Sequence, residues 1–227
     1  MSQNYRNKPK IILKNKAVFR KSDKTRQAIL DAALEYLWEH SYRDLTIREL
    51  MSLAGSSRSA FYRYYEDLPA MMEQLLNELE ERILAVAAAW FSGEGDPILM
   101  LRKSLGDMLG VCYQYGPIVR AVMDAAPTNE QLEKAWKSFA SNFDNAVTQE
   151  IKRQQSEGLI KSFDTQTVAM ALNRMNAEMV RYHFGHRPPT DQKIVRDAII
   201  RVWVATLYGD NALDSYFPEE KTSINLK

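Results

Sequence analysis

The chain has 227 residues, 45% of them hydrophobic, and a net charge of +1, a balance typical of a folded protein with a buried core. A single cysteine, Cys112, excludes an internal disulfide framework and any cysteine-based zinc site, and it fits a reducing cytoplasm. The longest apolar run, residues 83–91, is too short to cross a bilayer, and the basic N-terminus lacks a secretory signal. We therefore expect a cytoplasmic protein that makes no membrane contact.

The charge is polarised along the chain. Residues 1–70 carry 13 Lys or Arg against 8 Asp or Glu, whereas the remaining residues carry 17 against 21. Much of the basic excess falls within residues 1–21, which we predict to be a flexible N-terminal arm. Such an arm is either a solvated leader or a segment that neutralises nucleic-acid phosphates.

A helical pattern begins near residue 22. One stripe of this predicted helix carries five small or apolar residues: Ile29, Ala32, Ala33, Tyr36 and Leu37. So short a helix cannot bury that stripe alone, so we expect it to pack across the two helices that follow. Three such helices make a small DNA-binding module, which we assign to residues 22–67.

The second predicted helix begins with a capping box, in which Thr46 and Glu49 satisfy each other's free backbone N–H groups. Its buried face is predicted from the helical spacing of Ile47, Leu50, Met51 and Ala54. Gly55 ends it, since glycine readily takes the positive φ that a sharp reversal between two helices needs.

The third predicted helix has Ser56 and Ser57 as candidate caps. We expect Ala60, Phe61 and either Tyr64 or Tyr65 to point inward, which leaves these side chains outside: Arg58, Ser59, Tyr62 and Arg63. Two guanidiniums and a phenol suit phosphates and guanine edges, although the same residues can also be ordinary solvated surface groups.

Only helices are predicted beyond this point. The expected ranges are 68–90, 97–115 with a stop at Gly116-Pro117, 118–124, 127–155, 165–184 and 191–208. The prediction is an all-α fold in which residues 68–212 form a larger helical domain and residues 213–227 a C-terminal tail.

Nothing in the sequence supports catalysis. The chain lacks a Gly-x-Ser-x-Gly elbow, a phosphate-binding glycine loop and a His-Glu-x-x-His motif. His183 and His186 stand at a predicted helix end without a carboxylate at ligand spacing, so we expect neither a metal nor another cofactor. We interpret Cys112 as a small apolar packing residue.

The order of these parts resembles the TetR family of bacterial transcriptional regulators. The family's reading-helix segment is matched by Ser57, Phe61, Tyr62 and Tyr65, and the preceding helix by Thr46, Arg48 and Leu50. Residues 171–176 and 202–210 are similar to the ligand-domain helices of the EthR, or ethionamide-resistance repressor, branch of that family.

The chain departs from the family pattern at three places. Leu68 replaces a lysine that anchors a phosphate, which leaves that contact to the amides at the start of the helix. Ser59-Ala60 replaces Gly-Thr, and Ser56 replaces an apolar residue. These changes affect which operator is bound.

The resemblance implies two kinds of contact with double-stranded DNA. The residues implied to face bases are Arg48, Arg58, Ser59 and Arg63. The residues implied to hold the DNA backbone are Thr46, Ser57, Tyr62 and Tyr64.

The resemblance also implies a ligand cavity in the larger domain and a homodimer formed by the last two helices. The matching cavity positions are Leu101, Met108, Cys112, Trp136, Phe139, Phe143, Asn173, Asn176 and Trp203. Independently of the family, Asn173 and Asn176 share one helix face among apolar residues, so we expect at least one buried amide. Its partner is either a ligand or a neighbouring helix, and the aromatic positions are either cavity wall or ordinary core.

The predicted function is a homodimeric repressor that a small apolar effector releases from a palindromic operator. Two alternatives within the class are an activator and a regulator without an effector. An alternative from another class is an all-helical interaction module that does not bind specific DNA.

Overall fold

The computed structural model describes residues 23–209 and 212, so the predicted arm, residues 1–21, and tail, residues 213–227, lie outside the described residues. The described part contains helices and no strand, which confirms the all-α class. The elements are α1 Asp23–Glu39, η1 Tyr42–Asp44, α2 Ile47–Leu53, α3 Arg58–Phe61, α4 Leu68–Phe91, α5 Pro97–Ala125, η2 Ala126–Thr128, α6 Glu130–Ser156, α7 Thr165–Phe184 and α8 Gln192–Tyr208.

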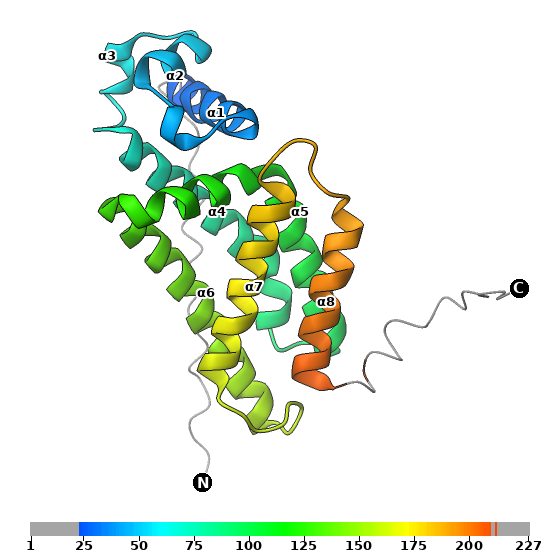
Figure 1. Ribbon diagram of the computed structural model, residues 1–227. Coiled ribbons are helices and arrows are strands. Elements are labelled where there is room, and N and C mark those ends of the chain that lie inside the picture. The colour runs from blue at the N-terminus through cyan, green and yellow to red at the C-terminus, as the bar shows by residue number, and fades with distance from the viewer. Residues whose placement is uncertain (1–22, 210–211, 213–227) are drawn as a thin grey trace, which may run out of the picture.

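The molecule has a small head and a larger bundle. Figure 1 shows α1, α2 and α3 together at one end, with α4 leading from them into a bundle that α5, α6, α7 and α8 complete. No helix of the described chain is long and apolar enough to span a bilayer.

The head is held together by the apolar faces of its three helices. From the predicted stripe of α1, Ile29, Ala33 and Leu37 are fully buried, whereas Ala32 is only partly buried. They meet Leu50 from α2 and Phe61 from α3, both also fully buried. Packing of these faces against each other stabilises helices that are too short to be stable alone.

The predicted stop at Gly116-Pro117 is wrong, because α5 runs unbroken from Pro97 to Ala125. Pro117 donates no hydrogen bond, but residues 116–122 are all buried, and this packing holds the helix together. Gly116 is needed for a close crossing with α7, since a Cβ there would lie 2.3 Å from the carbonyl oxygen of Phe184. Gly116 therefore marks close helix packing and not a helix end.

The other helix ends follow from local capping. The Asp164 carboxylate accepts from the Thr167 amide at 2.7 Å, and α7 has the predicted bounds. Asp191 caps α8, and Asn129 caps α6 after residues 126–128 form the short helix η2. The predicted range 127–155 thus began one short element too early.

Candidate DNA-binding surface and ligand cavity

A backbone hydrogen bond from the Ser56 amide to the Met51 carbonyl, 2.9 Å long, closes the turn between α2 and α3, and a side chain caps the start of each helix. Thr46 Oγ1 accepts from the Glu49 amide at 3.2 Å, and Ser57 Oγ accepts from the Ala60 amide at 3.3 Å. Gly55 has a φ of 60° with open space around its Cβ position, so backbone conformation alone explains the glycine. These contacts fix the crossing of two helices in a helix-turn-helix.

The short helix α3 separates an inner from an outer face. Ala60, Phe61 and Tyr65 are buried, and Tyr64 is half-buried, which resolves the choice between the two tyrosines. The outer face exposes Arg58, Ser59, Tyr62 and Arg63, in the orientation predicted from the sequence.

Two outer residues are coupled to each other. An Arg58 guanidinium nitrogen donates to the Tyr62 hydroxyl at 3.2 Å, and the guanidinium carbon lies 5.6 Å from the ring centroid. The hydroxyls of Ser57 and Ser59 are 3.0 Å apart. Thr46 and Arg48 are also exposed, and they line a shallow hollow beside α2. The structure thus brings a guanidinium, a phenol and several hydroxyls to one face of the head.

The start of α4 is already capped by a carboxylate. Asp67 Oδ1 accepts from the Ala70 amide at 2.8 Å, and Pro69 has no amide hydrogen to offer. A phosphate there would meet the negative charge of Asp67, which argues against these amides as a replacement for the missing lysine.

Arg120 of α5, which the sequence did not identify as a functional residue, joins the larger domain to the head. Its guanidinium donates to the carbonyl of Leu37 and, at 2.9 Å, to that of His40, at the end of α1. Burial lowers the pKa of Arg120, whose side chain is largely enclosed. The feature of the sequence that indicates its role is that Arg120 is the lone arginine in the otherwise apolar residues 116–123. Its partners lie some 80 positions earlier in the chain.

The larger domain contains two adjoining cavities, of about 60 and about 40 Å³. Every residue predicted for the cavity lines one or both of them: Leu101, Met108, Cys112, Trp136, Phe139, Phe143, Asn173, Asn176 and Trp203. Arg174, Val119 and Ile83 also line the larger cavity and were not predicted. The walls come from α4, α5, α6 and α7, and α8 contributes Trp203.

Both asparagines bond to neighbouring helices. The Trp203 indole N–H donates to Asn176 Oδ1 at 3.0 Å, and Asn173 Nδ2 donates to Asp144 Oδ1 at 3.0 Å. An indole nitrogen can only donate, so it fixes the amide orientation of Asn176. Of the two alternatives left open, contact with neighbouring helices is the one seen.

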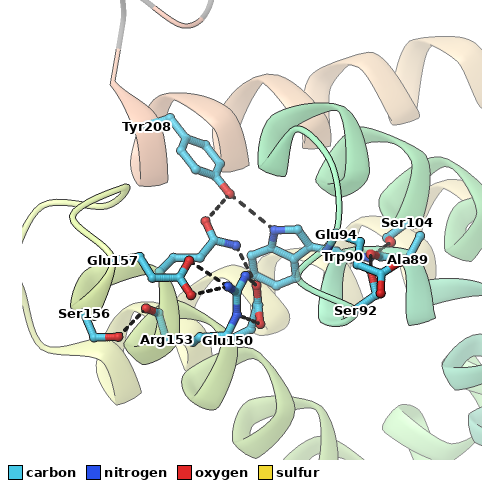
Figure 2. Close-up of polar contacts among 11 residues, drawn as sticks. Ala89, Trp90, Ser92, Glu94, Ser104, Glu150, Arg153, Ser156, Glu157 and Tyr208 are labelled. Carbon is cyan, nitrogen blue, oxygen red and sulfur yellow. Dashed lines mark hydrogen bonds and ion pairs between the residues drawn. The ribbon is translucent and has the colours of Figure 1, made fainter. Parts of the chain in front are cut away.

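A polar network closes the far end of the bundle (Figure 2). The Trp90 indole donates to the Tyr208 hydroxyl at 3.3 Å, and that hydroxyl donates to Gln154 Oε1 at 2.7 Å. Gln154 Nε2 donates in turn to Glu150, which Arg153 also contacts. Burial is the main cause that raises the pKa of Tyr208 to about 12. Trp90 lines the smaller cavity, so this network forms part of its support.

The candidate metal ligands and the single cysteine lie apart from one another in the part that the structure describes. There, no three His, Cys, Asp or Glu side chains gather closely enough to hold a metal ion. His183 Nδ1 lies 3.0 Å from the Thr190 hydroxyl, and His186 is exposed. Burial raises the pKa of the Cys112 thiol to about 12, which keeps it protonated at neutral pH.

Comparison with known proteins places this architecture in a family. Residues 29–79 match the bacterial regulatory proteins of the tetR family, and residues 101–209 match the C-terminal domain of the transcriptional regulator EthR. The chain belongs to the TetR family of transcriptional regulators.

Curated relatives cover most of the chain. It is 23% identical over 190 residues to the HTH-type transcriptional regulator EthR of Mycobacterium tuberculosis, covering 81% of this chain and 87% of that protein. It is 23% identical over 194 residues to EthR of Mycolicibacterium smegmatis, covering 82% and 88%.

Solved structures share the fold. A putative TetR-family regulator from Syntrophomonas wolfei has a TM-score of 0.69 at 16% identity, covering 82% of this chain and 95% of its own. A TetR regulator from Haloarcula marismortui has a TM-score of 0.66 at 22% identity, covering 82% and 99%. The SmeT–triclosan complex has a TM-score of 0.68 at 15% identity, covering 83% and 93%.

Proposed function

We propose that the protein is a homodimeric cytoplasmic repressor that a small effector releases from a palindromic DNA operator. The observation that carries the proposal is the continuity of α5. This helix lines the larger cavity through Met108 and Cys112 and holds the end of α1 through Arg120. A movement of the cavity wall formed by α5 would therefore also move the residue that holds the head.

The outer face of the head supports the DNA contacts. In the proposal, the side chains that read bases are Arg48, Arg58, Ser59 and Arg63, and those that hold the backbone are Thr46, Ser57, Tyr62 and Tyr64. All eight are exposed except Tyr64, which is half-buried. Exposed guanidiniums on a reading helix suit guanine edges, and hydroxyls beside them suit phosphates.

The last two helices support the proposed dimer. Tyr182 of α7 is 74% exposed, and Ile194 of α8 is 65% exposed. Met170 and Val202 are also large exposed apolar residues on these helices. An apolar surface on two neighbouring helices is suited to burial against the same surface of a second copy.

The size of the cavity supports an effector that changes the shape of the protein when it binds. A cavity of about 60 Å³ holds only a few water molecules, so a larger apolar molecule has to move its walls. SmeT, which shares the fold, forms a complex with triclosan. An effector that weakens DNA binding about 100-fold must favour the released conformation by about 2.7 kcal/mol.

The test begins with selection of bound sequences from a random pool of DNA duplexes. The proposal predicts a palindromic site with two half-sites in successive major grooves. Small apolar molecules are then screened for release of the protein from that site. If no sequence is enriched, the proposal is wrong, and an interaction module becomes the better account.

A further inference from the structure

The polar groups of the larger cavity all come from one helix. Asn173, Arg174 and Asn176 of α7 line it, and the lining residues of α4, α5 and α6 are apolar or aromatic. The side chain of Arg174 is 45% exposed, so it lies where the cavity meets solvent, between α6 and α7. The cavity therefore has an apolar interior and a guanidinium at its mouth.

Arg174 is held in place by a carboxylate on the facing helix. One terminal nitrogen of Arg174 donates to Asp144 Oδ2 at 2.8 Å, and the other donates to Oδ1 at 3.4 Å. Asp144 is buried, and it also accepts from Asn173. A guanidinium has five N–H donors, so three remain without a partner among the described residues.

Elsewhere in this chain, a guanidinium often bridges two carboxylates. Arg153 pairs with Glu150 and Glu157, and Arg181 pairs with Asp124 and Glu178. Arg174 has one carboxylate partner within the described chain, and it also lines the cavity.

We propose that the effector is an amphiphile with a carboxylate head, bound by Arg174, and an apolar tail that enters the cavity. This inference rests on the proposed effector function and names the chemical class of the ligand. The free donors of Arg174 suit a carboxylate, which a planar guanidinium binds through two parallel hydrogen bonds. The head stays at the hydrated mouth, and the tail lies among Met108, Phe139 and Phe143.

Asp144 and Arg174 are an ion pair in which the buried carboxylate of Asp144 needs a cationic partner. That carboxylate balances the charge of Arg174, so the mouth carries no unpaired cation before the ligand arrives. The ligand adds a second carboxylate on the half-exposed side of Arg174, where solvent screens the two negative charges from each other.

Three ligands with the same eight-carbon chain test the head group. Binding of octanoate, 1-octanol and octylamine to the full chain is measured by calorimetry at neutral pH. We expect octanoate to bind at least tenfold more tightly than octanol, and octylamine to bind most weakly. Equal or tighter binding of octanol overturns the proposal.

Variants on α7 test whether Arg174 causes the preference for octanoate over octanol. Arg174→Gln should reduce the preference for octanoate over octanol to about twofold or less and leave octanol binding unchanged, whereas Arg174→Lys should retain part of the preference. Arg181→Gln on the same helix removes an ion-paired arginine that does not line the cavity and should retain the full preference. A full preference in Arg174→Gln overturns the proposal.

If Arg174→Gln leaves the protein unfolded, because Asp144 is then a buried charge without a partner, the double variant Asp144→Asn with Arg174→Gln replaces both charges. We expect this double variant to lose the preference for octanoate in the same way. DNA release is measured separately with the selected operator. Preferred octanoate binding without release supports the ligand class and contradicts the release mechanism. Absence of binding by all three ligands overturns the ligand class, whereas the proposed function is tested by the DNA selection and by the screen for release.

Discussion

The outer face of α3 and the cavity wall on α7 present polar side chains in opposite ways. Arg58 of α3 and Tyr62, which directly follows α3, are exposed, and each has the other as a partner within the head. On α7, Asn176 is buried and bonded to Trp203 of another helix. Exposed side chains such as these contribute little to folding, whereas the buried amide is part of the core. Substitutions on the outer face of α3 should therefore change DNA affinity, whereas substitutions of the buried residues of α7 should change stability.

The largest expected effect is on the packing of the larger domain. Gly116→Ala should lower the free energy of unfolding by about 3 kcal/mol, because its Cβ would overlap the backbone of Phe184. Urea unfolding followed by circular dichroism measures the loss. Gly110→Ala is the matched control on the same helix, where the new Cβ has an ordinary contact of 3.5 Å with Gln192. It should stabilise by up to about 1 kcal/mol, and an equal loss in both variants would contradict the proposed role of close packing.

The next effect is on DNA binding by the head. Arg58→Ala should weaken binding to the selected operator by about 1 to 3 kcal/mol and relax the preference at one base pair per half-site. The free energy of unfolding should change by less than about 0.5 kcal/mol, since the side chain is exposed. Fluorescence anisotropy with single-base operator variants measures both affinity and preference. Unchanged operator affinity would show that Arg58 is only a surface charge.

Substitution of the buried amide of Asn176 should lower stability and leave DNA affinity unchanged. Asn176→Leu should lower the free energy of unfolding by about 1 to 3 kcal/mol, because the indole N–H of Trp203 loses its acceptor. Operator affinity without effector should stay the same. A double-mutant cycle with Trp203→Phe isolates the hydrogen bond, and additive losses would show that the two side chains are not coupled.

The smallest expected effect concerns the hydroxyl of Tyr62. Tyr62→Phe should weaken DNA binding by about 1 kcal/mol or less and by the same factor for all sequences, as a backbone contact does. The same anisotropy series measures it. A changed base preference would instead assign Tyr62 to base reading.

Features fixed by neighbouring residues were predictable from the sequence. Thr46, Ser57 and Asp164 cap helices through contacts within three residues, and the inner and outer faces of α3 follow from helical spacing. The nine cavity positions were located through resemblance to a family, because the spacing of aromatic residues does not separate cavity wall from core.

Features that join distant parts of the chain were not predictable in the same way. Gly116-Pro117 was read as a helix end because its partner, Phe184, is 68 positions away. Arg120 caps α1 across a similar separation, and Tyr208 meets Gln154 across 54. Arg174 was missed because only the folded chain places it opposite Asp144 at the mouth of the cavity.

The central claim is that the exposed face of the head binds a specific DNA sequence. The most direct test is the ratio of the dissociation constants for the selected operator and a scrambled duplex, measured over a range of salt concentrations. We predict that both affinities fall steeply with salt while the operator stays at least about 1,000-fold preferred. Equal affinities for the two duplexes, or absence of binding to either, would contradict the account.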